Sequence, residues 1–223
     1  MMTLEETLCL LESMASNKNI EGMKHFGIQG AKMLGISVTK LREVAKKIKT
    51  DHTLALELWA TGIHEARILA CLIDDIKLVT HEQMDAWVRD FDSWDVCDQA
   101  CNSLFYKHPL AFDKIFEWAE REPEFERRAG FALMACYAWH DKKAPDEKIS
   151  EFLPLIEKYA FDDRNFVKKA ANWALRQIGK RNRNLCVLAL DSARRIQQQA
   201  SKSAKWIASD AIRELEARLP ELG

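Results

Sequence analysis

The chain has 223 residues, of which 48% are hydrophobic and 30% charged, and its formal net charge is -1; these proportions exclude an intrinsically disordered protein. The longest apolar run, residues 131–139, is too short to cross a bilayer, and no basic stretch followed by an apolar segment predicts a secretory signal. The six cysteines are scattered without a C-x-x-C pair, which disfavours a disulfide scaffold and a zinc ribbon and predicts reduced thiols and a cytoplasmic location.

Helix signals follow one another along the chain. Apolar residues at helical spacing predict a helix over residues 38–48. Side chains that predict capped helix starts are Thr3 with Glu6, Thr80 with Gln83, and Ser93, which would begin a helix at Trp94. Residues expected to separate helices are Gly62, Pro109, Pro123, Pro145 and Gly179. With 27 alanines against 7 valines and no low-complexity linker, the sequence predicts an all-α chain forming one domain over residues 1–223.

Five segments share a small residue in the same register, which predicts an internal repeat. The aligned residues are Ala66, Ala100, Ala129, Ala170 and Ala204, at intervals of 34, 29, 41 and 34 residues. Such intervals are typical of HEAT-type helix pairs, in which each pair buries its face against its neighbours. The sequence therefore predicts a HEAT-like helical-repeat solenoid.

The residues just before the aligned alanines are expected to line one surface, commonly the concave face that binds a partner. Two residues before the alanines stand His64, Asp98, Arg127, Lys168 and Lys202. One residue before them stand Glu65, Gln99, Arg128, Lys169 and Ser203. This predicts a basic ribbon with the single carboxylate Asp98. The alternative is a solvated face without a binding role.

Charge is segregated along the chain. Residues 164–213 contain twelve Lys and Arg and only two acidic residues, a net charge of +10, whereas residues 1–163 have a net charge of -9. A near-neutral protein with one strongly basic third is typical of a polyanion binder, nucleic acid above all. The alternative is that the basic residues only keep the helices soluble.

Two helical segments combine an aromatic residue with a charge four residues away. Trp94 and Asp98 would share one helix face, where an electron-rich ring and an anion stabilise a developing cation. Lys169 and Trp173 have the same spacing, which suits phosphate contact and base stacking. The alternatives are a buried structural Trp94 with Asp98 as a cap or ion-pair partner, and a Trp173 that belongs to the core.

Several familiar chemistries are missing. The sequence contains no G-x-x-x-x-G-K-[ST], G-x-G-x-x-G or H-E-x-x-H motif, and no pattern of a covalent nucleophile. Cys97 and Cys101 are four residues apart, but without a third ligand at suitable spacing they are interpreted as buried thiols. We therefore expect neither a metal nor a cofactor.

These motifs together resemble the HEAT-like DNA alkylation repair family, the AlkD-like alkylpurine DNA glycosylases. That family has a W-D-x-x-D helix and a later K-A-x-x-W-x-L-R helix, which correspond here to residues 94–98 and 169–176. Arg128-Ala129 matches an R-A pair in an intermediate helix, and Leu34-Gly35-Ile36 followed by Arg42 resembles the N-terminal element. The resemblance extends from about residue 20 to residue 215.

The resemblance implies a C-shaped protein that holds duplex DNA in a basic concave groove and excises purines alkylated at N3 or N7 without a metal or cofactor. By position, Asp98 is the catalytic carboxylate, and Trp94 and Trp173 flank the deoxyribose of the lesion. Arg128 grips the DNA backbone, and the basic residues expected beside it are Arg127, Lys168, Lys169, Arg176 and Lys202. One departure is Ser93, since the pattern has a second Trp before the first motif Trp.

The prediction is thus a cytoplasmic, monomeric α-solenoid that binds damaged duplex DNA and hydrolyses the N-glycosidic bond of alkylated purines. Two alternatives remain open. One is a noncatalytic relative that binds branched or damaged DNA, and the other is a HEAT-type protein scaffold. Both motif tryptophans and Asp98 favour the enzyme, and the basic third favours DNA over the scaffold.

Overall fold

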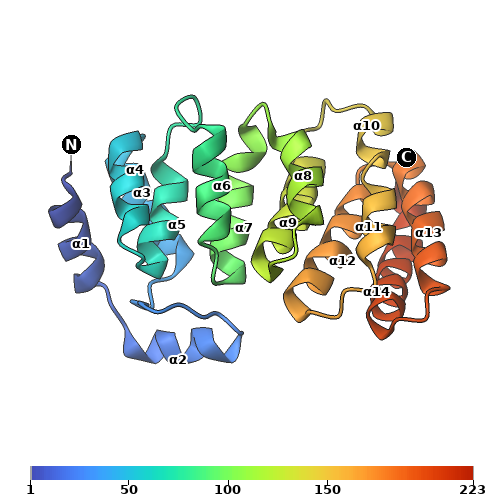
Figure 1. Ribbon diagram of the computed structural model, residues 1–223, viewed down its shortest axis with the longest axis horizontal. Coiled ribbons are helices and arrows are strands. Elements are labelled where there is room, and N and C mark those ends of the chain that lie inside the picture. Colours follow the sequence, from blue (N-terminus) through green and yellow to red (C-terminus); the bar gives the residue numbers. More distant parts are fainter. Residues whose placement is uncertain (1, 223) are drawn as a thin grey trace. The chain divides into compact units, whose positions relative to one another are not determined.

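Figure 1 shows the computed structural model, which describes residues 2–222 and consists of helices joined by loops. The chain divides into two compact units, Met1–His108 and Pro109–Gly223. Over residues 2–222 there is no β-strand, only an isolated bridge between Lys32 and Ile63. No helix in this range has the length and apolar character needed to cross a bilayer. The all-α prediction is confirmed, and the single-domain assignment stays a prediction.

The first unit contains seven α-helices and one short 3-10 helix among its described residues. They are α1 (Leu4–Ser13), α2 (Asn17–His25), α3 (Val38–Ile48), α4 (His52–Ala60), α5 (His64–Ile73), α6 (His81–Arg89), α7 (Trp94–Ser103) and η1 (Phe105–Lys107). Helix α3 has the predicted bounds, and Gly62 lies between α4 and α5 as predicted. Trp59 of α4 and Trp87 of α6 stack in the core with ring centroids 4.0 Å apart.

The two predicted capping boxes differ in the structure. Thr3 Oγ1 accepts from the Glu6 backbone N–H at 3.2 Å, and Glu6 Oε2 accepts from the Thr3 N–H at 2.8 Å, so this box is complete. Thr80 Oγ1 accepts from the Gln83 N–H at 3.1 Å, but the Gln83 side chain donates to Asp74 instead of returning to Thr80. The second box is therefore only half formed, because a buried carboxylate competes for the Gln83 amide.

The second unit contains seven α-helices of 5 to 17 residues and one short 3-10 helix among its described residues. They are α8 (Ala111–Glu120), α9 (Glu124–His140), α10 (Asp146–Ser150), α11 (Leu153–Tyr159), α12 (Asn165–Gly179), α13 (Arg183–Gln197), α14 (Lys202–Arg218) and η2 (Leu219–Glu221). Pro109, Pro123 and Pro145 precede helices as predicted, whereas Gly179 is the last residue of α12 and does not lie in a connection. Within this unit, α8 packs against α9, and α12 packs against α9, α13 and α14.

The predicted repeat is present as packed helices. All five aligned alanines are fully buried, and they lie on α5, α7, α9, α12 and α14. Helix α5 packs against α7 in the first unit, and α12 packs against α9 and α14 in the second, so the helices that carry these alanines are neighbours within each unit. Small side chains let the helices approach closely. This arrangement confirms the helical-repeat fold.

The register of the repeat is less regular than the alignment predicts. Ala66 and Ala204 are the third residues of α5 and α14, whereas the other three alanines are the sixth or seventh residues of their helices. The alignment is thus displaced by about one helical turn at two helices, since a turn has ~3.6 residues. Positions expected on the basic ribbon but buried in the structure are His64, Glu65, Arg128 and Ser203. A basic ribbon along the whole chain stays a prediction.

Candidate functional site

Helix α7 presents the predicted aromatic and carboxylate pair. It begins at Trp94 with Ser93 as its N-cap, so Trp94 and Asp98 are one turn apart on the same helix face. Both side chains are half-buried. The indole Nε1–H of Trp94 donates to the carbonyl oxygen of Phe26 at 3.3 Å, which connects α7 with the segment after α2. An aromatic ring and an anion therefore lie together on a partly accessible face.

The neighbouring carboxylate, Asp95, has a structural environment. Its Oδ1 accepts from the Ser93 hydroxyl at 2.6 Å, and its Oδ2 lies 2.9 Å from Nε2 of His64 on α5. Ser93 makes no side-chain capping bond, because its hydroxyl bonds Asp95 instead. Ser93 is 1% exposed, so at the position where the family pattern has a second Trp this chain has a buried structural residue. Asp95 is thus buried in a structural contact, whereas Asp98, about one turn later, is half-buried.

The pKa of His64 is raised above its ordinary value of 6.5. Burial of the ring opposes its charged form, but the hydrogen bond and the charge of Asp95, with Glu65 and Asp92 nearby, outweigh that effect. The protonated ring is therefore favoured in the folded state and holds α5 against the start of α7.

This pKa shift predicts a pH-dependent stability. A raised pKa contributes stability that is fully present below the unfolded pKa near 6.5 and is lost as the pH rises through the folded pKa. We expect the stability advantage of the natural chain over His64→Gln to decrease as the pH rises from about 5.5 to about 8.5. Urea denaturation of both proteins across this range measures the difference. An advantage that is constant or grows with pH would contradict the assignment.

Glu65, next to His64, holds the loop before α3. Its carboxylate accepts three backbone N–H groups, from Leu34 at 2.8 Å, Gly35 at 2.6 Å and Ile36 at 3.2 Å. The loop needs glycine, because Gly35 has a φ of +77° and a Cβ there would lie 2.3 Å from the Ser16 carbonyl oxygen. The N-terminal element predicted around Leu34 thus depends on a buried carboxylate about 30 residues away, which no local pattern could indicate.

In the second unit, the three predicted DNA-binding arginines bond to the protein itself. Arg127 donates to Asp162 at 2.7 Å and lies over the ring of Tyr159. Arg128 is 5% exposed and donates to the carbonyl oxygen of Phe166 at 2.6 Å. Both residues connect α9 to the start of the next repeat.

Arg176 on α12 has the same character. It pairs with Glu214 and lies 3.5 Å from Asp210, both on α14. Burial raises the pKa of Glu214, but the hydrogen bonds and positive charges of Lys180 and Arg176 outweigh that effect and hold this pKa below its ordinary value. Trp173, three residues before Arg176, is half-buried on the same helix.

The three predicted lysines are the accessible charges. Lys169 and Lys202 are exposed and Lys168 is half-buried. Over the described part of the chain, no carboxylate pairs with any of them. Charges that are not neutralised inside the protein are the ones that can release counterions from a polyanion. Of the six predicted basic residues, the lysines are therefore the strongest candidates for phosphate contact.

The predicted site is divided between the two units. Trp94 and Asp98 belong to the first unit, and Trp173 and all the predicted basic residues belong to the second. Cys97 and Cys101 on α7 are fully buried, in agreement with their interpretation as core thiols.

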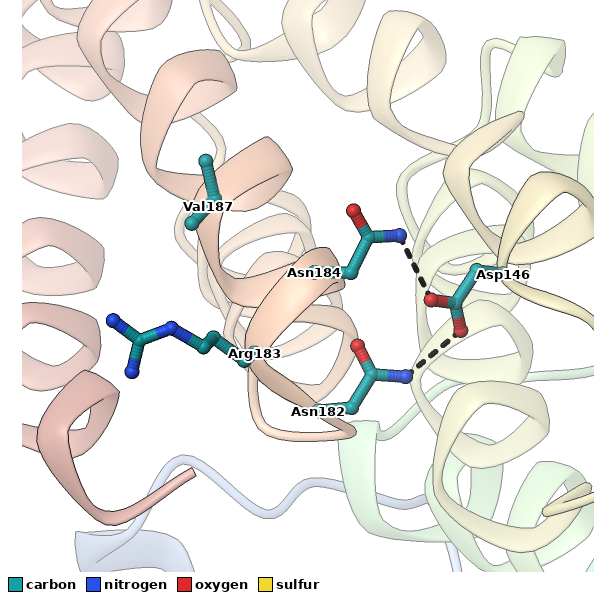
Figure 2. Close-up of a pocket in the computed structure, with 5 residues that line it drawn as sticks. All are labelled: Asp146, Asn182, Arg183, Asn184 and Val187. Carbon is teal, nitrogen blue, oxygen red and sulfur yellow. Dashed lines mark hydrogen bonds between the residues drawn. The ribbon is translucent and has the colours of Figure 1, made fainter. Parts of the chain in front are cut away.

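A shallow depression in the second unit contains none of the predicted residues. Figure 2 shows its lining, in which the Asp146 carboxylate accepts from the amides of Asn182 and Asn184, each at 2.8 Å. Arg183 and Val187 complete the lining. Both oxygens of the acid are used to connect α10 with α13, so this depression is interpreted as a structural contact.

Comparison with known proteins identifies a family and a solved structure with a similar fold. A family model for DNA alkylation repair enzymes matches residues 8–215. A solved structure with 21% sequence identity matches with a TM-score of 0.77, covering 96% of this chain and 95% of its own. It is described as one of a new family of proteins related to the HEAT-like repeat DNA glycosylases with affinity for branched DNA structures. Among curated proteins, no sequence matches significantly. Since the family model spans nearly the whole chain, the protein belongs to the DNA alkylation repair family.

Proposed function

We propose that the protein hydrolyses the N-glycosidic bond of N3- or N7-alkylated purines in duplex DNA. The observation that carries this proposal is the α7 face, where Trp94 and Asp98 are both partly accessible while Asp95 is committed to His64 and Ser93.

The proposed chemistry needs few groups. A purine alkylated at N3 or N7 is already cationic, so the bond to the sugar breaks with its electron pair going to the base, which leaves neutral. Asp98 stabilises the positive charge that develops on the sugar, and Trp94, on the same helix face, offers an electron-rich ring to it. A water oxygen then forms a bond to the anomeric carbon, and the proton that this water loses passes to the solvent. Neither a metal nor a cofactor is required, since the leaving group needs no activation.

DNA binding is proposed to depend on the accessible lysines. Replacing Lys168 and Lys169 together with Ala is expected to weaken duplex binding and to lower the slope of log K against log salt by about 2, or ~0.9 for each lost phosphate contact. Fluorescence anisotropy with labelled duplex at several salt concentrations measures this slope. Lys142 and Lys143, two adjacent exposed lysines after α9, are the matched control. An unchanged slope in the Lys168/Lys169 variant would place the DNA site elsewhere.

The direct test of the function is release of free base from duplex DNA that contains 7-methylguanine. The natural chain is expected to release the methylated base without an added metal and to leave unmodified guanine in place. Chromatography of the released base detects the reaction. No release above the spontaneous rate would contradict a glycosylase.

One further candidate has an observation in its favour. The solved structure with the same fold is described through its affinity for branched DNA structures, and this chain departs from the glycosylase pattern at Ser93. A noncatalytic DNA binder would bind a four-way junction more tightly than a linear duplex and release no base. The same two assays, base release and binding, therefore separate the two functions.

A further inference from the structure

Trp206 on α14 is a large apolar side chain at the surface. It is 42% exposed, whereas Ser203, Ala204 and Ile207 on the other side of the same turn are buried. It lies four residues after Lys202, so the two side chains share one helix face. Water solvates the large apolar ring of an exposed Trp poorly, so an exposed Trp indicates a surface that binds a ligand or partner.

Positive charge lies close to this ring. Nζ of Lys168, on the neighbouring helix α12, lies 5.1 Å from the centroid of the Trp206 ring. Lys202 and Lys205 are exposed on the first turn of α14. As with Lys168 and Lys202, no carboxylate within residues 2–222 pairs with Lys205. The surface made by Lys168, Lys202, Lys205 and Trp206, here called the α14 patch, is therefore both basic and aromatic.

The start of α14 is held firmly. The Ser201 hydroxyl accepts from the N–H of Ser203 at 3.1 Å and donates to the carbonyl oxygen of Phe161 at 3.3 Å. The Ser203 hydroxyl donates to the carbonyl oxygen of Asp162 at 2.7 Å. Phe161 itself is 56% exposed, so a second accessible aromatic ring belongs to the loop that these bonds attach to α14. A surface that is ordered before binding loses less entropy when a ligand binds.

We propose that the α14 patch binds unpaired bases of single-stranded DNA, with Trp206 as the stacking platform and the lysines on the flanking phosphates. Every base has an aromatic face, so stacking on Trp206 is independent of sequence, and phosphate contacts by lysine make it sensitive to salt. Bases within a duplex are stacked on one another and do not offer a free face. The patch thus adds a preference for DNA with a single-stranded segment, and this inference rests on the proposed DNA binding.

The test is the affinity of the full chain for a single-stranded oligothymidine and for an undamaged duplex, measured by anisotropy. Trp206→Ala is expected to weaken binding of the single strand about tenfold, which corresponds to about 1.4 kcal/mol, and to change duplex binding by less than about twofold. Trp206→Phe, which keeps an aromatic face, is expected to restore most of the affinity. In the natural chain, stacking should also quench tryptophan fluorescence, and Trp206→Phe should lose that part of the quenching.

Trp139 supplies a matched control. It is 52% exposed, against 42% for Trp206, and Nζ of Lys142 lies 5.2 Å from its ring centroid. Trp139 thus has a comparable exposure and lysine contact without the rest of the α14 patch. Trp139→Ala is expected to bind the single strand as the natural chain does. Equal losses in both variants, or no loss in Trp206→Ala, would overturn the proposal.

Base release from methylated duplex separates this inference from the proposed catalytic function. Trp206→Ala should keep the rate of the natural chain, because Trp206 is outside the proposed catalytic pair. If the natural chain released no base but the single strand still required Trp206, the glycosylase function would fail and the α14 patch would stand.

Discussion

Asp98→Asn is expected to slow the release of 7-methylguanine by roughly two to three orders of magnitude while DNA binding is retained. A carboxylate ~4 Å from a developing positive charge is worth about 4 kcal/mol at an effective dielectric constant of about 20. Each ~1.36 kcal/mol of barrier corresponds to a factor of ten in rate, so the loss approaches a thousandfold. Asparagine has nearly the same shape, and removal of a negative charge favours the approach of phosphates. Single-turnover base release together with duplex anisotropy measures both effects.

The choice of control depends on the structure. From sequence alone, Asp95→Asn appears a natural control, since Asp95 is on the same helix. The buried contacts of Asp95 with Ser93 and His64 make it unsuitable, because its substitution disturbs the junction of α5 and α7. Asp92 is exposed just before the helix, and its substitution removes the same charge. It lies 3.8 Å from Arg67 of α5 but takes no part in the two buried hydrogen bonds of Asp95. Asp92→Asn should excise at nearly the natural rate. Equal rates in Asp98→Asn and the natural chain would remove Asp98 from the mechanism.

Glu65→Gln is expected to lower the free energy of unfolding by about 3 kcal/mol. The buried carboxylate accepts three backbone N–H groups from residues 34–36. The amide replaces one accepting oxygen with an NH2 donor, which faces N–H groups that have no water to bond. For a protein of this size the melting temperature should fall by about 10 °C. Urea denaturation and thermal melts by circular dichroism measure the two quantities.

Glu57 on α4 is the control for Glu65, since it is exposed and the same substitution there removes the same charge. Glu57→Gln should change stability by less than about 0.5 kcal/mol. A loss below about 1 kcal/mol in Glu65→Gln would show that the loop has other sufficient support. The loop matters to the site as well, because the segment before it contains Phe26, whose carbonyl oxygen accepts from Trp94.

The helical architecture and the main features of α7 follow from local sequence patterns. The capping box at Thr3, the bounds of α3 and the start of α7 at Trp94 were all predicted, because they depend on contacts within about four residues along the chain. The repeat was visible through its buried alanines, since close helix packing excludes larger side chains there. The spacing of Trp94 and Asp98 likewise follows from helix geometry alone.

Which basic side chains remain accessible depends instead on contacts between helices that are far apart in the sequence. Arg127 and Arg176 look like the accessible lysines in the sequence, but each has an acidic partner more than thirty residues away, and Arg128 is buried against the carbonyl of Phe166. Asp95 is buried and Asp98 is half-buried, and it is the packing of α5 against α7 that brings His64 to Asp95. The cost of burying a charge is offset by partners that come from other repeats, so no local pattern reveals it. Those long-range contacts, and not the local sequence, separate the residues that hold the helices together from those that remain accessible at the surface.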